Sequence, residues 1–437
     1  MLVNLYVWRS LPMNRQASSL KNREGFKFNL IRLKMKNNKV NQYLMHKALF
    51  IFRIKKRLGN LAIASLLIGI LFPGCQDRQR VSSDYKTFIV NYHTKNTEHF
   101  ETFLDMANIS ITHFKADDTL FLSENLQVKY TENYIFLLDK VYEQLYRFND
   151  SGQLINKIGR SGLGPSEYVN TGFFTVDDNN RTLSILHNNG TAIMIFDYDG
   201  NFLREFSTPF IITSFDQLDS NLYFYYTGYS NSPSFKRLHM ADTLKILNSF
   251  LPLQTQAFDM IEMNFTAMGD YGYFREVYFP TIYKYSYSGI HEIFKINFGH
   301  CEITQKMLEE VKDPFEFFEK IQNNGFCSTA SLIAAGSKYY VVTIEQKSGF
   351  NQVSHFYIDL EDSIYTRVYS NANNLIEYDF FSQLKPVYID SENNLHFISS
   401  QIELKTFLNA RPDMKLNSSM SDNNLNPLIV KIPINKN

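Results

Sequence analysis

The feature that most constrains how this chain folds is a unit of short strands and turns that recurs from about residue 126 onward. Each unit opens with a short apolar run closed by a cluster of Asp, Asn, Ser or Gly, and a strand rich in β-branched and aromatic residues follows. These following strands are "YIFLLD" (134–139), "TLSILH" (182–187), "NLYFYY" (221–226), "YYVVTI" (339–344) and "LHFIS" (395–399). Apolar and polar residues that alternate between turn clusters are typical of half-buried strands. The chain is therefore predicted to be all-β.

The next part of each unit is predicted to be a hairpin. "LYRFNDSGQLINKIG" (145–159) and "IMIFDYDGNFLREFS" (193–207) match closely, with turn glycines at Gly152 and Gly200. "YKYSYSGIHEIFKINFG" (283–299) repeats the form at Gly289, and "LHMADTLKIL" (238–247) repeats it without glycine. Asp-Gly and Ser-Gly turns favour the positive φ angles that tight hairpins require. Four short strands per unit, at a spacing of 39 to 63 residues, indicate the blades of a β-propeller.

Six units are predicted, with the fourth placed near "REVYFP" (275–280). A four-stranded blade cannot cover its own apolar faces, so the blades are expected to pack radially and bury one another. Closing such a ring usually needs strands from both ends of the chain. "FETFLDMANISITHF" (100–114) and "NPLIVKIPI" (426–434) are the candidates. The expected fold is a six-bladed β-propeller with four-stranded blades over residues 100–437.

One segment breaks the pattern between the fourth and fifth units. "EITQKMLEEVKDPFEFFEKIQNN" (302–324) is charged, nearly free of β-branched residues and helical in period on either side of Pro314. It is predicted to be a helical insertion on one face of the propeller. It could be a lid or a partner contact, but a solvated excursion is the favoured interpretation.

The N-terminal region contains a secretion signal. Four cationic residues in Arg53–Arg57 precede a twelve-residue apolar core, Leu61–Phe72, which is too short to span a membrane and right for a signal peptide. The ending "LFPGC" resembles a bacterial lipobox and predicts lipidation of Cys75; the alternative is a simple cleaved signal followed by an ordinary cysteine. Residues 1–44 are then an upstream extension outside the fold, 45–74 the signal peptide and 75–99 a tether.

The charge of the exported part excludes one class of partner. Residues 1–74 contain 14 Lys and Arg and a single acid, Glu24; subtracting these from totals of 44 and 44 leaves 30 basic and 43 acidic residues in 75–437. Such an acidic body repels phosphate backbones, so no nucleic acid partner is expected. The only Trp, Trp8, precedes the signal peptide, so indole platforms for sugars are also absent from the exported part.

The stretch "KIGRSGLGPSEY" (157–168) holds three glycines and a proline where one blade is predicted to end and the next to begin. Glycines allow turns that other residues resist, and a strand-like segment follows them, so a phosphate-binding loop before a helix is disfavoured. With its hairpin, "FNDSGQLINKIGRSGLGPSEY" resembles NHL-like repeats and, more closely, the six-bladed β-propeller lipoproteins of Bacteroidetes. That resemblance implies a propeller fold and a location in the cell envelope, and it implies no reaction. Within the envelope, the outer membrane is the expected location.

Residues of this loop are also the first candidates for binding. Arg160 could project into the axial opening and Tyr168 offers a ring with a polar tip. Equally, Arg160 and Glu167 could form an ion pair across the loop and fix its shape, which is the favoured interpretation. Cys301 and Cys327 could form a disulfide or remain two independent buried thiols, and the latter is favoured.

Catalytic patterns are weak. The histidines after the signal form neither an H-x-x-x-H nor an H-E-x-x-H motif, and no G-x-S-x-G elbow surrounds Ser166. A divalent ion, Ca²⁺ or Zn²⁺, would need polar residues at inner-strand ends, and the candidates are His187, Asp216, Glu276 and His396. Their types do not form a matching ring, so no cofactor is expected.

Three functions remain open. The leading hypothesis is a non-enzymatic binding or scaffold module, anchored to the membrane by lipid, for a peptide, glycan or protein partner. The second is an NHL-like or lactonase-like lyase or hydrolase with a divalent metal in the axial channel. The third is a component of a surface nutrient-uptake assembly.

Overall fold

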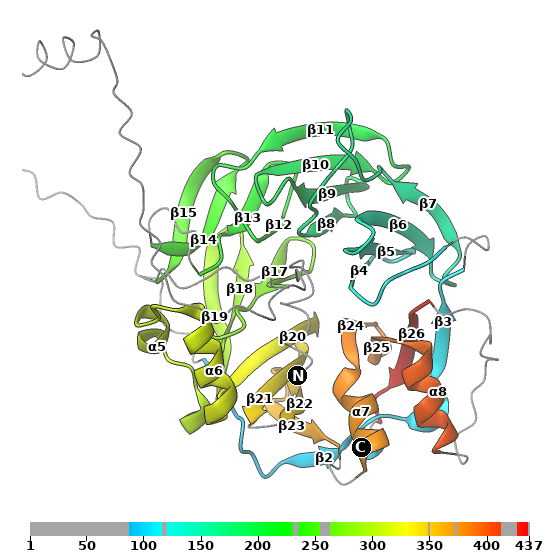
Figure 1. Ribbon diagram of the computed structural model, residues 1–437, viewed down its shortest axis with the longest axis vertical. Coiled ribbons are helices and arrows are strands. Elements are labelled where there is room, and N and C mark those ends of the chain that lie inside the picture. The colour runs from blue at the N-terminus through cyan, green and yellow to red at the C-terminus, as the bar shows by residue number, and fades with distance from the viewer. Residues whose placement is uncertain are drawn as a thin grey trace, which may run out of the picture. The chain divides into compact units, whose positions relative to one another are not determined.

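The structure is a computed structural model that describes residues 87–115, 120–229, 235–253, 263–347, 350–370, 374–411 and 426–435. Within these ranges the chain forms a ring of six antiparallel sheets around a central axis (Figure 1). This confirms the predicted six-bladed β-propeller. Cys75, the signal peptide and the N-terminal extension lie outside the described residues.

The first three blades are four-stranded, and the order of the strands in each sheet follows the sequence. Blade 1 contains β4 (Leu126–Tyr130), β5 (Tyr134–Asp139), β6 (Gln144–Asn149) and β7 (Leu154–Ile158). Blade 2 contains β8 (Phe174–Asp177), β9 (Thr182–His187), β10 (Ala192–Asp197) and β11 (Phe202–Ser207). Blade 3 contains β12 (Ser214–Gln217), β13 (Leu222–Tyr226), β14 (Lys236–Asp242) and β15 (Lys245–Pro252).

The next two blades each gain a fifth strand from the N-terminal segment. Blade 4 contains β16 (Phe265–Ala267), β17 (Tyr271–Phe274), β18 (Thr281–Ser286) and β19 (Gly289–Asn297), with β1 (Phe88–Asn91) parallel to β19. Blade 5 contains β20 (Cys327–Ala335), β21 (Lys338–Lys347), β22 (Phe350–Asp359) and β23 (Ile364–Tyr369), with β2 (Thr97–His99) parallel to β23. The sequence assigned residues 75–99 to a tether. In the structure, β1 and β2 of this segment pair with the exposed edges of the outer strands β19 and β23.

Blade 6 closes the ring with both ends of the chain, as expected. It contains β24 (Lys385–Ile389), β25 (Asn394–Ser399), β26 (Leu428–Pro433) and β3 (Ser110–His113), and β3 pairs antiparallel with β26. The closing strand also contacts blade 1. The N–H of Lys115 donates to the carbonyl of Gly152 at 2.8 Å. Gly152 has φ +81°, and a Cβ there would lie 2.2 Å from the carbonyl oxygen of His113, so only glycine fits this hairpin turn.

The helices are few and short. The expected insertion between blades 4 and 5 forms α5 (Gln305–Glu309) and α6 (Pro314–Asn324), in which Asp313 caps the helix and Pro314 takes the first turn. Three further α-helices in the described part were not expected: α4 (Phe100–Phe103), α7 (Leu375–Gln383) and α8 (Gln401–Asn409). Short 3₁₀ turns lie at Met106–Asn108 and Gly299–Cys301.

The core is divided among the interfaces between blades. Phe136 of blade 1 packs in one cluster with Phe196 of blade 2, and Leu137 of blade 1 packs in another with Ile429 of blade 6. Each of these side chains is at most 1% exposed. Similar clusters contain residues of blades 2, 3 and 4, of blades 4 and 5, and of blades 5 and 6. Each sheet is therefore stabilised mainly by its neighbours, as the repeat predicted.

The fourth unit differs from the sequence prediction. "REVYFP" (275–280) is not a strand; the second strand of blade 4 is β17, which ends at Phe274. Val277, Tyr278 and Phe279 instead pack in a cluster with Phe317 and Ile321 of α6. The apolar residues of this segment pack against the helical insertion. Because they are buried there, the segment has the apolar composition of a strand without being one.

Candidate functional site

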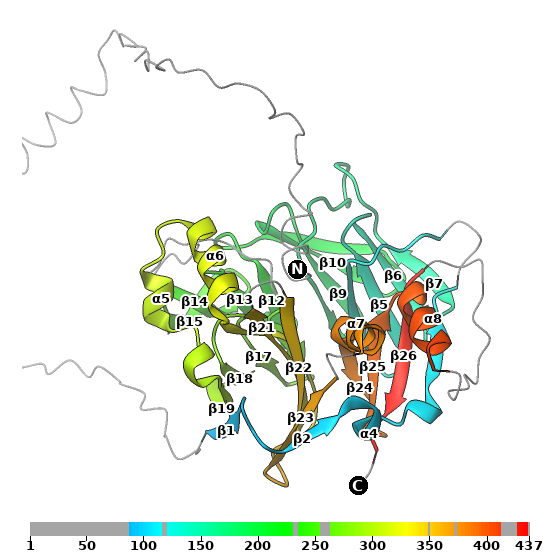
Figure 2. The ribbon, with the colours of Figure 1, turned by 60° about the horizontal axis from the view of Figure 1, so that its bottom comes forward.

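The two faces of the ring differ in what they carry. Because the strands of each blade alternate in direction, the loops after every second strand and the links between blades emerge on the same face. We call this the connector face; it includes loops such as 140–143, 159–173 and 208–213. Helices α5, α6 and α7 lie in links between blades, and α8 lies in the loop between β25 and β26 on the same face, whereas the opposite face carries tight turns such as 131–133 and 198–201 (Figures 1 and 2).

Exposed apolar side chains gather on the connector face. Leu163 is 90% exposed, Leu375 71% and Ile402 68%. Among the described residues, eleven of the twenty exposed large apolar side chains belong to its loops and helices: Phe121, Val141, Tyr142, Leu163, Ile211, Phe235, Met263, Phe315, Leu375, Ile376 and Ile402. Single exposed apolar residues are ordinary on protein surfaces, so the feature that distinguishes this face is that more than half of them gather on it.

The glycine-rich loop of this face is held by an internal ion pair. The guanidinium Nε of Arg160 lies 2.5 Å from Oε1 of Glu167, and Oε2 of Glu167 accepts the N–H of Gly164 at 2.6 Å. A Cβ on Gly162 would lie 2.0 Å from that carboxylate oxygen, so the glycine makes room for the carboxylate. The geometry supports the predicted structural role of the pair. Arg160, 74% exposed in its side chain, still offers part of its guanidinium to solvent.

Tyr168 is not a surface residue. Its side chain is fully buried, and its hydroxyl donates to the carbonyl of Ile158 at 2.7 Å while accepting the N–H of Leu145 at 3.0 Å. Burial raises the pKa of its phenol. Gly159, at φ +55°, lies against the same ring. Tyr168 therefore fastens the loop to blade 1 and cannot contact a ligand from this position.

The two histidines considered as metal ligands lie apart. His187 ends β9 on the connector face, where its Nε2 is 3.2 Å from Glu205. His396 lies near the start of β25, beside the opposite face, with its Nε2 3.1 Å from Asp390. Burial lowers the pKa of both imidazoles, although each carboxylate partner opposes that effect. The structure does not bring these two histidines together.

The two carboxylates considered with them are occupied by protein groups. Glu276 forms a two-pronged ion pair with Arg237, with N–O distances of 2.5 and 2.8 Å. Asp216 accepts hydrogen bonds from Thr175, at 2.5 Å, and from the Tyr285 hydroxyl. Both carboxylates are at most 1% exposed. Their contacts join neighbouring blades.

The axis is crossed by a lysine that the sequence analysis did not identify. Nζ of Lys129, on the inner strand of blade 1, donates to the carbonyl of Phe265 on the inner strand of blade 4 at 3.3 Å. Blades 1 and 4 lie opposite each other in a ring of six, so this side chain reaches across the centre. Burial lowers the pKa of Lys129, opposed by the nearby Asp216 carboxylate. Its ammonium group would repel a metal ion placed at the same depth.

The comparisons with known proteins give one matching family and solved structures of low sequence identity. Residues 106–435 match a family model described as "Domain of unknown function (DUF4934)". A crystal structure from Bacteroides fragilis NCTC 9343, described as a "Putative exported protein", has 16% sequence identity and a TM-score of 0.64, and covers 80% of this chain and 100% of its own. A member of the DUF4221 family from Bacteroides vulgatus ATCC 8482 has 10% identity and a TM-score of 0.47, covering 76% of this chain and 100% of its own.

No protein with a curated function matches the sequence. Across the part of the chain that the structure describes, no helix combines the length and apolar character needed to cross a membrane. At these sequence identities, the likeness to solved structures concerns the fold alone.

Proposed function

Because the chain belongs to the DUF4934 family, a family of unknown function, we propose a function from its own surface: a non-enzymatic binding module that holds a protein partner in the cell envelope. The observation that carries this proposal is the concentration of exposed apolar side chains on the connector face. Apolar and aromatic anchors surrounded by polar residues supply most of the binding free energy in protein interfaces. The opposite face, built from tight turns, offers fewer such anchors.

The three most exposed side chains of this face favour a protein or peptide over a glycan, although Phe121, Tyr142, Phe235 and Phe315 of the same face carry rings. Leu163, Leu375 and Ile402 are aliphatic, so they provide neither a ring for a sugar to stack on nor a hydrogen-bonding group. A protein partner with its own apolar residues would bury them. The helices α7 and α8, which contact each other, present two of these three residues from neighbouring elements.

A metal-dependent lyase or hydrolase at the axis has less support. The proposed ligands His187 and His396 face different ends of the ring, and Lys129 places a cation across the centre. An exposed apolar surface suits a scaffold, including a component of a nutrient-uptake assembly.

The location is proposed from the sequence. We propose that the protein is exported and that Cys75 carries a lipid that anchors it, at the outer membrane, as in the NHL-like propeller lipoproteins it resembles. Metabolic labelling of cells with a fatty-acid precursor tests this. The wild-type protein should take up label and a Cys75→Ser variant should not; label retained by the variant would refute the anchor.

The binding face is tested by site-specific photo-crosslinking in cells. A crosslinking residue at Leu163, Leu375 or Ile402 should give the same discrete adduct, and one at Leu244, 53% exposed in a turn of the opposite face, should give none. With the partner purified, Leu375→Asp should weaken binding at least tenfold, about 1.4 kcal/mol, and Leu244→Asp should leave it unchanged. Equal adducts from both faces, or none from the connector face, would contradict the proposal.

A further inference from the structure

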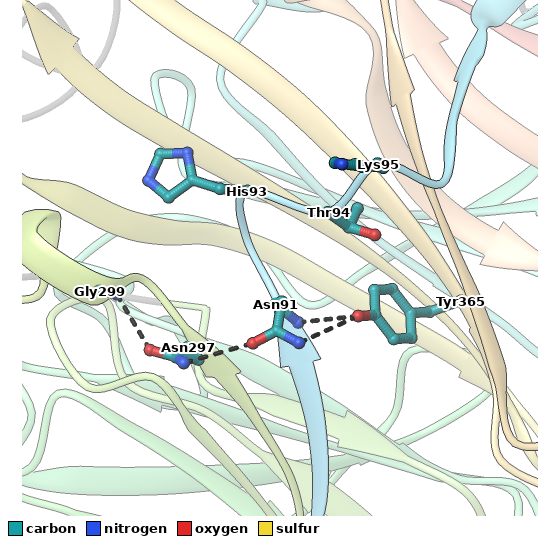
Figure 3. A pocket seen from close by; sticks show the side chains of 7 residues that line it. All are labelled: Asn91, His93, Thr94, Lys95, Asn297, Gly299 and Tyr365. Carbon is teal, nitrogen blue, oxygen red and sulfur yellow. Dashed lines mark hydrogen bonds between the residues drawn. The ribbon is translucent and has the colours of Figure 1, made fainter.

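Two segments about 200 residues apart in sequence meet at the rim of blade 4. Strand β1 pairs in parallel with β19, and the register places Asn91 opposite Asn297 at the ends of both strands. The Asn297 side-chain amide donates to Oδ1 of Asn91 at 3.3 Å, and the N–H of Gly299 donates to Oδ1 of Asn297 at 3.0 Å (Figure 3). The residues that follow each strand are therefore held side by side.

Three metal-ligand side chains meet just beyond these asparagines. His93 follows β1, and His300 and Cys301 lie in the 3₁₀ turn after β19. The ligand atoms of the three side chains lie within 4.8 Å of one another. The two imidazole rings are parallel, with centroids 5.4 Å apart and planes inclined by 5°. Both histidines are exposed, whereas Cys301 is 2% exposed beneath them.

We propose that His93, His300 and Cys301 form a binding site for a divalent, borderline-soft metal ion of the Zn²⁺ class. Imidazole nitrogen and thiolate sulfur are the ligands that Zn²⁺ prefers, and three protein ligands with one open position are a common arrangement. Tetrahedral Zn²⁺ with bonds of about 2.0 to 2.3 Å needs ligand atoms roughly 3.3 to 3.7 Å apart. Closing the present separation requires a movement of about 1 Å, which rotation of two exposed histidine side chains can supply.

The surroundings of the cluster suit such an ion. A surface pocket of about 430 Å³ lies beside it, and His93 and Gly299 belong to the pocket lining (Figure 3). Water or an anionic group could reach a fourth coordination position from this side. Metal binding would release the proton of the Cys301 thiol, as it does at other thiolate sites.

Cys327 supports Cys301 from within the core. It is fully buried and belongs to the same core cluster as Cys301, and Glu302, the residue after Cys301, forms a β-bridge with Cys327. Both cysteines are free in the structure. The same proximity would allow a disulfide to form under oxidising conditions, and that would remove the metal ligand.

The test is Co²⁺ binding to the full chain in a Cys75→Ser background, in which Cys301 and Cys327 are the only cysteines. Under reducing conditions we expect about one equivalent of Co²⁺ and the thiolate-to-Co²⁺ charge-transfer absorption. Cys301→Ser should abolish that absorption, and His93→Ala or His300→Ala should weaken Co²⁺ binding at least tenfold. His291→Ala, a half-buried histidine of β19 outside the cluster, is the matched control and should bind normally.

The outcomes separate the site from its alternatives. Unchanged absorption in Cys301→Ser, or normal affinity in both histidine variants, would overturn the proposal, as would a reduced wild-type protein that gives no thiolate signal. Circular dichroism of each variant shows whether the propeller is intact. Zn²⁺ should displace Co²⁺ and remove the absorption. This result is independent of partner binding by the connector face, since the crosslinking positions lie outside the cluster.

Discussion

The buried ion pair between Arg237 and Glu276 gives the sharpest test of how the blades are joined. Arg237 lies on β14 of blade 3 and Glu276 follows β17 of blade 4, with side chains 4% and 1% exposed. The Tyr226 hydroxyl donates to the same carboxylate at 2.9 Å. Glu276→Gln preserves the shape of the side chain but leaves the buried guanidinium without a counter-charge.

Breaking one side of a buried pair typically costs about 3 to 5 kcal/mol, and the amide oxygen of Gln can still accept a hydrogen bond, so we expect about 3 kcal/mol. For a fold of about 350 residues, an unfolding entropy of about 2.1 cal/mol/K per residue converts this loss into a fall in Tm of roughly 4 °C. Urea unfolding followed by circular dichroism, together with calorimetry, measures both quantities.

Two controls accompany this variant. Glu310→Gln removes an exposed partner of Lys306 and should change the free energy of unfolding by less than about 0.5 kcal/mol. Replacing both buried partners, Arg237→Met with Glu276→Leu, should recover much of the loss because no buried charge is left alone. A Glu276→Gln protein as stable as the wild type would refute the structural role of Glu276 and return it to the list of candidate ligands.

Three further predictions concern stability, each measured by urea unfolding. Gly159→Ala should lower the free energy of unfolding by about 3 kcal/mol, because the backbone has positive φ and the new Cβ would lie 2.8 Å from two aromatic rings. Gly269→Ala also places alanine at positive φ, but no atom lies within 4 Å of the new Cβ, so the loss should be only about 1 kcal/mol. Arg160→Ala should lower the free energy of unfolding by about 0.5 kcal/mol. Glu167→Ala should lower it by about 1 to 2 kcal/mol, because the Glu167 carboxylate also accepts the N–H of Gly164. Burial lowers the pKa of His355 to about 3, so the unfolded chain takes up this proton at a higher pH than the folded chain does. The free energy of unfolding should therefore fall by roughly 2 kcal/mol between pH 7 and pH 5. The fall should be smaller in His355→Gln, which lacks the imidazole.

These predictions fail in distinct ways. Equal losses in the two glycine variants would show that the rings move aside. A larger loss in Arg160→Ala than in Glu167→Ala would show that the exposed guanidinium, not the carboxylate, holds the loop. Identical pH dependence in the wild type and His355→Gln would place the acid sensitivity in other groups, such as His239, whose pKa burial also lowers, to about 4.

Local signals explain where the sequence predicted the fold correctly. "TLSILH" coincides with β9 residue for residue, because alternation and bounding turns are properties of the segment itself. Ring closure by β3 and β26 followed from the same logic, since a blade that lacks a strand must take one from the other end of the chain. Helix α8 carried a readable signal that was missed: Ser400 and Glu403 form a capping box at its start.

Packing explains where the sequence misled. The run "REVYFP" has the composition of a strand, yet its apolar residues lie under α6, and composition alone cannot tell which neighbour buries a side chain. Likewise, Tyr168 was chosen for its polar tip, and only the structure shows that this tip bonds to the backbone of blade 1.

The sequence by itself determined that this chain is built from six repeated units of strands, that both ends close the ring, and that the Arg160–Glu167 loop serves the architecture. The repeated units and the loop depend on residues near one another along the chain, and ring closure follows from the number of strands that each repeated unit must contain. Only the tertiary structure decided that Lys129 crosses the axis, that the links between blades gather exposed apolar residues on one face, and that His93 meets His300 and Cys301. The physical reason is that each of these depends on which distant strands become neighbours, and strand pairing across some 200 residues leaves no periodic trace in the sequence.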